Sequence, residues 1–186
     1  MPDLSYSDIV FKPLDAFDDV SSFHSTEQEL DNFLKEDALN NQTNRLSATF
    51  LACWDDELAG YFTLINDSLV AEAVHELDRE PSWEYRKYPA IKIARMARHR
   101  DFEGHGIGTL MLLRIFIIVL HVSQFTGCRI ITVDSKPGAV DWYRKKGFTL
   151  AQLKQRDDTI PLYMDFHRFV SQEEQRLLAT LPDFSE

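Results

Sequence analysis

Three glycines at alternate positions, Gly104, Gly106 and Gly108, separate an apolar run that starts at Ile91 from a longer apolar run that follows. Glycine leaves the backbone uncovered, so the N–H groups of such a turn can point together at one anion. A helix that begins at the turn adds the positive end of its dipole. The pattern therefore predicts a phosphate or pyrophosphate site where a strand gives way to a helix.

The spacing of these glycines separates the turn from two common phosphate loops. No Gly-Lys-Ser or Gly-Lys-Thr follows them, so the turn is not a Walker loop. The order Gly-x-Gly-x-Gly also differs from the Gly-x-Gly-x-x-Gly of dinucleotide-binding folds. The alternative is a tight turn in which the glycines serve only to adopt positive φ.

A second group of residues lies at 139–148, where the sequence is AVDWYRKKGF. This run resembles the pattern Ala-x-x-Phe/Tyr-Tyr-x-x-x-Gly-Phe that ends the fourth helix of GNAT acetyltransferases. The run from Glu103 to Gly108 is similar to their coenzyme A motif, Gln/Arg-x-x-Gly-x-Gly/Ala. The resemblance implies an acetyl-CoA-dependent acyltransferase without a metal. It also implies a single GNAT-like α/β domain over residues 1–186, with a mixed, mostly antiparallel sheet flanked by helices.

The resemblance assigns roles to individual residues. Tyr143 matches the tyrosine that donates a proton to the departing coenzyme A sulfur, although it could instead be a packed aromatic whose hydroxyl is hydrogen-bonded. The backbone N–H groups of Met96 and Ala97 would hold the acetyl carbonyl in the manner of an oxyanion hole. The expected coenzyme contacts are Met96, Ala97, Arg98, Glu103, Gly104, His105, Gly106, Ile107, Gly108 and Thr109.

Glu103 places a carboxylate where the family has Gln or Arg, close to the expected pyrophosphate. Like charges repel, so we expect Glu103 to point outward or to pair with Arg98 or Arg100. The acceptor amine must be neutral to attack, and a base or a water relay must take its proton. The candidate bases are Glu72, His99 and Asp134, although Asp134 could equally cap the end of a strand.

Other positions resemble the branch of the superfamily that includes bacterial toxins acetylating the amino group of aminoacyl-tRNA. They are Phe23, Leu30, Asp31, Phe33, Leu34, Ala38, Asn41, Gly60, Tyr61, Phe62, Leu64 and Ala94 to Ala97. The primary prediction is acetyl transfer to a primary amine of a small molecule or protein. The alternatives are acetylation of aminoacyl-tRNA and a non-catalytic coenzyme A-binding regulatory module. The expected partners are the amine acceptor, aminoacyl-tRNA under the toxin hypothesis, and a second copy in a homodimer.

The charge distribution bears on the choice of acceptor. The net charge is −10, and residues 1–40 hold ten acidic residues against two lysines. Residues 85–100 hold six Lys or Arg and no acidic residue. RNA binding draws much of its affinity from phosphate contacts, so the acidic balance argues against RNA, whereas the basic strip and Arg144 to Lys146 argue for it. An acidic face would attract a cationic amine.

The sequence also indicates a cytoplasmic protein that does not enter the membrane. The N-terminus lacks the apolar segment of a signal peptide, and the longest apolar run, residues 110–122, contains Arg114 and is too short to cross a bilayer. Cys53 and Cys128 are expected to be reduced thiols in strands. The histidines lack zinc-ligand spacing; His99 and His105 are expected at the surface and His121 in the core.

Hydrophobic periodicity and turn signals predict the elements that position these residues. Strands are expected at 8–14, 48–54, 59–65, 91–98, 128–134, from Phe148, and at 160–166. Helices are expected after a capping box formed by Thr26 and Glu29, at 106–124, at 137–146 and at about 171–181, where Ser171 would provide the cap. Residues 66–90 carry mixed signals.

Overall fold

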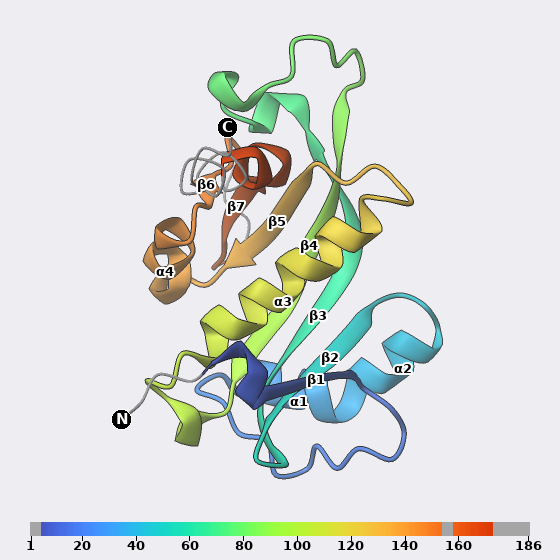
Figure 1. The fold of residues 1–186 in the computed structure, drawn as a ribbon, viewed down its shortest axis with the longest axis vertical. Coiled ribbons are helices and arrows are strands. Elements are labelled where there is room, and N and C mark those ends of the chain that lie inside the picture. The colour runs from blue at the N-terminus through green and yellow to red at the C-terminus, as the bar shows by residue number, and fades with distance from the viewer. Residues whose placement is uncertain (1–4, 154–157, 173–186) are drawn as a thin grey trace, which may run out of the picture. The chain divides into compact units, whose positions relative to one another are not determined.

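The computed structural model describes residues 5–153 and 158–172 (Figure 1). Within them, seven strands form one sheet in the order β1-β2-β3-β4-β5-β7-β6. The expected α/β class with a mixed sheet and flanking helices is confirmed. Internal contacts divide the chain into two compact units, Met1–Asn66 with Lys92–Thr126, and Asp67–Ile91 with Gly127–Glu186.

The first unit is built on an antiparallel arrangement of β1 (Ile9–Pro13), β2 (Ala48–Trp54) and β3 (Glu57–Val70). The predicted hairpin is confirmed, and β3 extends beyond its predicted end. Asp55 and Asp56 form its two-residue turn with φ of 49° and 64°. Positive φ at both positions matches the twist of the strands, and aspartate tolerates this conformation better than most residues.

The helical segment after β1 begins without the predicted threonine cap. It consists of α1 (Gln28–Asn32), a π-helical turn η2 (Phe33–Asp37) and α2 (Ala38–Thr43). Glu27 is the N-cap and makes no side-chain capping bond, so the Thr26 prediction is wrong. The preceding chain turns back so that Asp31 Oδ1 accepts from the Ser25 N–H (2.8 Å) and Oγ–H (2.6 Å). Ser25 Oγ in turn accepts from the Glu27 N–H at 3.1 Å.

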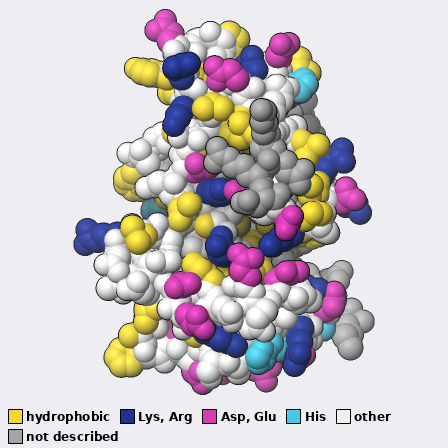
Figure 2. All heavy atoms as spheres, turned by 180° about the vertical axis from the view of Figure 1, so that it is seen from behind, with side chains coloured by type: hydrophobic (Ala, Val, Ile, Leu, Met, Phe, Trp, Pro, Cys, Tyr) yellow, Lys and Arg dark blue, Asp and Glu magenta, His cyan; other side chains and the backbone are white. Residues whose placement is uncertain are grey.

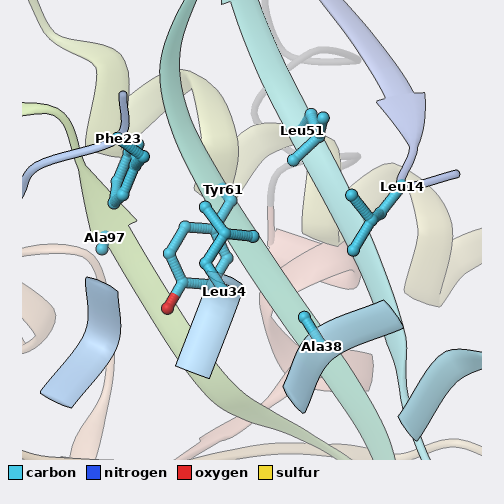
Figure 3. Close-up of a cluster of buried hydrophobic side chains, with 7 residues drawn as sticks. All are labelled: Leu14, Phe23, Leu34, Ala38, Leu51, Tyr61 and Ala97. Atoms are coloured by element: carbon cyan, nitrogen blue, oxygen red, sulfur yellow. The ribbon is translucent and has the colours of Figure 1, made fainter. Parts of the chain in front are cut away.

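The core of the first unit lies between this helical segment and the sheet. Its buried cluster (Figure 3) joins side chains from the segment, from β2, β3 and β4 (Lys87–Arg98), and from the chain between β1 and α1. The members are Leu14, Phe23, Leu34, Ala38, Leu51, Tyr61 and Ala97. The Tyr61 hydroxyl donates to the Leu30 carbonyl at 2.7 Å, which fastens α1 to β3.

Helix α3 (Ile107–Val122) follows β4 after a short 3-10 turn, η5 (Arg100–Phe102), as the sequence predicts. Its buried side chains include Ile115 and Val119, which lie one turn apart on one stripe. His121 is exposed, so its prediction as a core residue is wrong. It follows Val119 by two positions and therefore lies about 200° around the helix from it.

The second unit holds β5 (Ile130–Ser135), α4 (Val140–Lys145), β6 (Thr149–Leu150) and β7 (Ile160–Asp165), with β7 antiparallel to both β5 and β6. The 3-10 turn η6 (Pro137–Ala139) leads into α4. The stretch between β3 and β4, where sequence signals are mixed, contains η3 (Ala71–Ala73) and η4 (Glu76–Asp78). A further 3-10 turn, η1 (Tyr6–Asp8), precedes β1 in the first unit.

The C-terminal helix begins earlier than predicted. Residues 166–172 are already helical, and Asp165 Oδ1 accepts from the Arg168 N–H at 3.0 Å, as an N-terminal cap does. Ser171 therefore lies inside the helix, where its hydroxyl donates to the His167 carbonyl at 2.9 Å. The remainder of the predicted helix, up to residue 181, falls outside the described residues.

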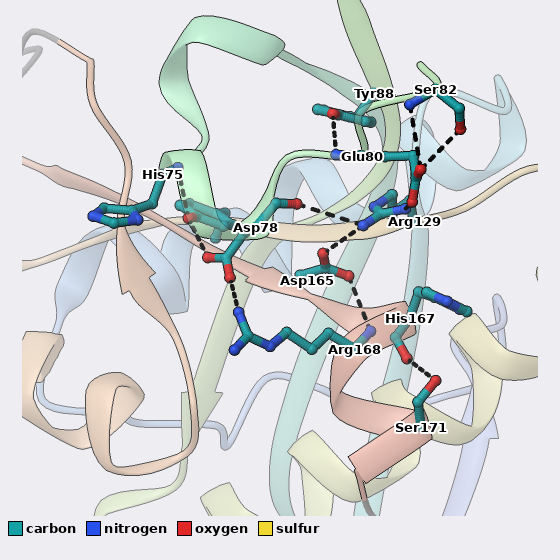
Figure 4. Close-up of polar contacts among 11 residues, drawn as sticks. His75, Asp78, Glu80, Ser82, Tyr88, Arg129, Asp165, His167, Arg168 and Ser171 are labelled. Carbon is teal, nitrogen blue, oxygen red and sulfur yellow. Dashed lines mark hydrogen bonds and ion pairs between the residues drawn. The ribbon is translucent and has the colours of Figure 1, made fainter.

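A network of charged residues fastens the stretch between β3 and β4 within the second unit (Figure 4). Asp78 accepts from the Tyr163 hydroxyl at 2.7 Å and pairs with Arg168. Arg129 pairs with Asp165 at 2.9 Å and with Glu80 at 3.4 Å. Charge-assisted bonds of this kind are stronger than neutral ones, so η4 is held to β7 and to the start of β5.

Across the described residues, no helix is long and apolar enough to cross a membrane, and no cluster of His, Cys, Asp or Glu could hold a metal ion. Cys53 and Cys128 are both free thiols and both partly buried.

Candidate functional site

The glycine turn has open space around it. Gly104 and Gly106 adopt φ of 81° and 77°, and a Cβ added to either would meet no atom within 4 Å. Gly106 is the N-cap of α3, and no side chain caps that end. The first N–H groups of a helix lack intrahelical acceptors, so those of α3 can serve a ligand. The glycines therefore provide positive φ and leave room for an anion beside the helix.

Arg98 and Glu103 form an ion pair beside this turn, which is one of the arrangements expected from the sequence. Arg98 Nη2 donates to Glu103 Oε1, and the glutamate side chain is 70% exposed. The pair neutralises the carboxylate that replaces the family's Gln or Arg. Among the described residues, Arg98 Nη1 is buried without a hydrogen-bond partner. A buried donor without an acceptor is costly, and an anion at the turn would satisfy it.

The end of β4 is fixed by close backbone contacts. A Cβ on Gly60 of β3 would lie 3.0 Å from the Ala97 carbonyl oxygen and 2.9 Å from Met111 Sδ of α3. Glycine is therefore needed there for β3, β4 and α3 to approach one another. The His99 N–H donates to the Ala59 carbonyl at 2.8 Å, which holds the segment just after Met96 and Ala97.

His99 is less exposed than the sequence predicts, and its ring nitrogens both face the backbone. Its side chain is 15% exposed and packs edge-on against Phe23 and Phe102. Nδ1 accepts from the Asp101 N–H at 3.3 Å, and Nε2 lies 3.4 Å from the Ser22 carbonyl. This arrangement uses the lone pair that a general base needs, which argues against His99 in that role.

His105 also lies partly buried at the turn. Its ring packs against Trp54, with the centroids 5.3 Å apart, and Nδ1 lies 3.0 Å from the Glu103 carbonyl. The expected surface position of His105 is therefore only partly correct. Its ring contacts Trp54 and the backbone of the turn and is only partly exposed to solvent.

Arg95, which belongs to the basic strip and to the positions that resemble the toxin branch but has no role assigned from the sequence, has a distinctive environment in this unit. Its guanidinium lies 5.1 Å from the Phe33 ring centroid, and Nη1 donates to the neighbouring Ala94 carbonyl at 2.8 Å. Nε is buried and has no hydrogen-bond partner in the described part of the chain. The π-helical turn presents Phe33 to Arg95, and π-helical turns are frequent at functional sites. No pattern in the sequence signals that turn.

Tyr143 lies in the second unit, on α4. It is 6% exposed, and its ring packs edge-on against Phe148 and Trp142. Among the described residues its hydroxyl has no hydrogen-bond partner. Burial raises the pKa of Tyr143 well above its usual range, which keeps the hydroxyl protonated at neutral pH.

Gly147 ends the helix that carries Tyr143. Its φ is 95°, and the Phe148 N–H donates back to the Tyr143 carbonyl at 3.1 Å. This is the glycine-dependent helix ending that the sequence predicts. It turns the chain so that Phe148 packs against the tyrosine ring.

The other two candidate bases occupy different environments in the second unit. Glu72 is exposed on η3, and its backbone carbonyl accepts from Arg79 Nη2 at 3.3 Å. Asp134 lies within β5, opposite Pro161 of β7, and is exposed.

Comparison with known proteins decides the family. The family model described as acetyltransferase (GNAT) family matches residues 14–148. The chain belongs to the GNAT family. It is therefore an acyltransferase that moves an acetyl group from acetyl-CoA to a primary amine, and the expected cosubstrate is confirmed.

The chain is similar in sequence and in fold to individual GNAT acetyltransferases. The chain is 31% identical over 119 residues to a tRNA-acetylating toxin of Mycobacterium tuberculosis, covering 63% of this chain and 70% of that protein. Its fold is similar to AtaT complexed with acetyl-methionyl-tRNA (TM-score 0.80, 19% identity, 89% of this chain and 99% of that one). It is equally similar to a mutant of KacT (TM-score 0.79, 19% identity, with the same coverage). The predicted resemblance to the toxin branch is thus confirmed.

Proposed function

We propose that this GNAT enzyme acetylates the amino group of an aminoacyl-tRNA. The observation that carries the proposal is the 31% identity to a tRNA-acetylating toxin. The likeness to AtaT, whose structure contains acetyl-methionyl-tRNA, agrees with it at the level of the fold.

The residues of the glycine turn fit the pyrophosphate of coenzyme A. The open space at Gly104 and Gly106, the uncapped start of α3 and the unsatisfied Arg98 Nη1 all suit a bound anion. Ile107, Gly108 and Thr109 would contribute backbone from the first turn of α3, and His105 and Glu103 would shape its rim. Acetyl-CoA supplies an acyl group on a sulfur leaving group, and the backbone of Met96 and Ala97 would hold its carbonyl.

Tyr143 is the proposed proton donor in the transfer. The acceptor nitrogen forms a bond to the acetyl carbon, the carbon–sulfur bond breaks, and the sulfur leaves with the electron pair. The Tyr143 hydroxyl, protonated and without a partner among the described residues, would give that sulfur a proton. A tyrosine held in an apolar pocket does not lose its proton to water before the substrate arrives.

The surroundings of His99 support an α-amino acceptor over a lysine side chain. Both ring nitrogens of His99 face backbone groups, so it is poorly placed to deprotonate a strongly basic amine. An α-amino group has a pKa of about 7.7–8.0, against about 10.4 for lysine. An α-amine is therefore substantially neutral at pH 8 without a strong base, as aminoacyl-tRNA acetylation requires.

A small-molecule or protein amine is the second candidate acceptor. The net charge of −10 favours it, because an acidic protein attracts cationic amines and repels RNA. The test is to incubate the protein with acetyl-CoA and separate pools of aminoacylated tRNA, peptides and polyamines, and to follow acetylation by mass spectrometry. We expect the acetyl group on the aminoacyl-tRNA. Acetylation of peptides or polyamines alone would contradict the proposal.

The expected homodimer remains a proposal, and α3 offers a face that supports it. Leu113, Ile117 and Leu120 are 43%, 47% and 46% exposed and lie at helical spacing on one stripe. Apolar stripes of this kind commonly pack against another helix. An antitoxin partner is proposed on the ground that a similar structure is AtaT bound to the C-terminus of the antitoxin AtaR.

A further inference from the structure

An exposed group of aromatic and basic side chains lies between β3 and β4, in the second unit. Tyr85 is 72% exposed and Trp83 is 36% exposed, and both precede β4 by a few residues. Arg86 and Lys87 follow them directly and are exposed. We call these four residues, Trp83, Tyr85, Arg86 and Lys87, the aromatic–basic platform.

The Trp83 ring of the platform stacks on the buried ring of Tyr88. Trp83 lies parallel to Tyr88, with centroids 5.7 Å apart and an interplanar angle of 16°. Tyr88 is only 2% exposed, and the Arg129 guanidinium lies 5.6 Å from its ring centroid. The Tyr85 ring lies beside Trp83, with centroids 4.9 Å apart and an interplanar angle of 52°, so it is tilted against Trp83 and leaves its own ring largely exposed. The aromatic surface therefore packs against the buried Tyr88 on one side and is exposed to solvent at Tyr85.

Hydrogen bonds hold this stack in one conformation. Trp83 Nε1 donates to the Lys87 carbonyl at 3.1 Å, and the Trp83 N–H donates to the Glu80 carbonyl at 3.0 Å. The Glu80 N–H donates to the Tyr88 hydroxyl at 2.9 Å, and the Ser82 hydroxyl donates to the Glu80 carboxylate at 2.8 Å (Figure 4). A preformed aromatic surface loses little conformational entropy on binding.

The cations beside the stack are available to a ligand. Neither Arg86 nor Lys87 forms an ion pair with another described residue. Figure 2 shows basic and hydrophobic side chains side by side at its upper end, where Figure 1 places the chain between β3 and β4. Acidic side chains lie among them; Glu84 is one exposed carboxylate that opposes an anionic ligand. Glu80 is offset by Arg129.

We propose that the aromatic–basic platform binds unpaired nucleotides of RNA, with bases stacking on Tyr85 and Trp83 and phosphates contacting Arg86 and Lys87. Exposed aromatic rings interleaved with cations are the chemistry of single-strand recognition. A protein partner would not require two unpaired cations beside the rings. The inference extends the proposed function, because aminoacyl-tRNA carries unpaired nucleotides, and it assigns a surface other than the acetyl-transfer site.

The test measures RNA binding by fluorescence anisotropy. The probes are a fluorescein-labelled octauridylate, which does not stack on itself, and a labelled blunt RNA duplex. Tyr85→Ser removes the outermost ring without touching the buried Tyr88, and Tyr85→Phe retains the ring. Phe17→Ser removes an aromatic ring that is 98% exposed elsewhere on the chain and serves as the matched control.

We expect Tyr85→Ser to weaken octauridylate binding by roughly 5- to 100-fold, the range for loss of one stacked base. Tyr85→Phe and Phe17→Ser should bind as the wild type does. The loss should persist at high salt, because stacking is not screened. Arg86→Ala should instead flatten the dependence of log affinity on log salt by about 0.7.

Equal octauridylate affinity for Tyr85→Ser and Phe17→Ser would overturn the platform. A second result would also overturn it: if Tyr85→Ser has a different molecular mass from the wild type by light scattering but the same octauridylate affinity, the face is a contact between protein copies. The platform and the proposed function can fail separately. If the wild type acetylates aminoacyl-tRNA while Tyr85→Ser leaves its KM for tRNA and its octauridylate affinity unchanged, only the platform is wrong. If octauridylate binding depends on Tyr85 but aminoacyl-tRNA is not acetylated, only the proposed acceptor is wrong.

Discussion

At the scale of single residues, one buried cation is left without a partner beside the glycine turn. Arg98 Nη1 is buried and has no hydrogen-bond partner among the described residues. Proteins rarely leave buried polar groups unpaired without a reason. The unpaired Arg98 Nη1 is explained if the pyrophosphate of coenzyme A supplies the missing acceptor, as we propose.

Gly106→Asp is expected to abolish coenzyme A binding. The substitution places a carboxylate beside the start of α3, where an added Cβ would meet no atom within 4 Å. The positive φ also costs about 1–2 kcal/mol for a residue with a Cβ, so stability should fall modestly while the fold persists. Calorimetric titration with acetyl-CoA measures the effect, and Gly127→Asp, at a glycine without positive φ, is the control. Unchanged affinity in Gly106→Asp would remove the turn from the coenzyme site.

Tyr143→Phe is expected to lower kcat by about 10²–10⁴-fold and to leave the affinity for acetyl-CoA nearly unchanged. The ring that packs against Phe148 is retained, and only the proton donor is lost. Steady-state kinetics with acetyl-CoA measures this. Tyr163→Phe is the matched control, because its hydroxyl donates to Asp78 and should affect stability rather than turnover. A kcat for Tyr143→Phe within a few-fold of the wild type would require a different donor.

At the scale of elements, the start of α1 depends on one buried carboxylate. Burial alone would raise the pKa of Asp31, but the two hydrogen bonds from Ser25 outweigh it, and the pKa lies below its usual range. A lowered pKa stabilises the fold at pH values above the unfolded-state pKa of about 3.9, and the gain is lost as pH falls through the folded-state value.

Asp31→Asn should therefore destabilise the protein by about 1–2 kcal/mol at pH 7, since it replaces charge-assisted bonds by neutral ones. As the pH falls below the unfolded-state value of about 3.9 and through the lower folded-state pKa, the difference from the wild type should shrink because Asp31 itself becomes protonated. Urea unfolding of both proteins across this pH range provides the comparison. A constant difference at every pH would show that the charge of Asp31 does not stabilise α1.

Helix α3 offers the element-level test of the proposed dimer. Ile117→Glu places a charge at the centre of the exposed stripe formed with Leu113 and Leu120. If the stripe packs against a second copy, burial of that charge is unfavourable and the variant should be monomeric. Light scattering measures the mass. Lys145→Glu, which changes the charge of an exposed residue on α4, is the control. The same mass for the wild type and Ile117→Glu would exclude this stripe as the dimer contact.

At the scale of the whole molecule, the sequence predicted what depends on local pattern. The β2–β3 hairpin, α3 and the glycine that ends α4 follow from alternation, periodicity and glycine positions, and all three are confirmed. The Arg98–Glu103 pair was one of three arrangements expected for Glu103 beside the proposed pyrophosphate site. These features require no knowledge of which distant segments meet.

Features that depend on tertiary packing escaped prediction. The apolar spacing of Leu30, Phe33, Leu34 and Ala38 suits an ordinary helix, so the π-helical turn within it leaves no signature. Thr26 and Glu29 had the spacing of a capping box, but Asp31 reached back to Ser25 instead. The stack of Trp83 on Tyr88 depends on Arg129 from another part of the chain and could not be read from residues 66–90.

The whole molecule is a GNAT enzyme, and we propose that its acceptor is aminoacyl-tRNA. The most direct measurement incubates wild-type protein with labelled acetyl-CoA and either aminoacylated or deacylated tRNA, then hydrolyses the ester and identifies the released amino acid by mass spectrometry. We expect N-acetylated amino acid from the aminoacylated tRNA and none from the deacylated tRNA. With Tyr143→Phe, we expect the rate of acetylation to fall by about 10²-fold or more. Release of only free, unacetylated amino acid from the aminoacylated tRNA in wild-type reactions would contradict the proposed acceptor.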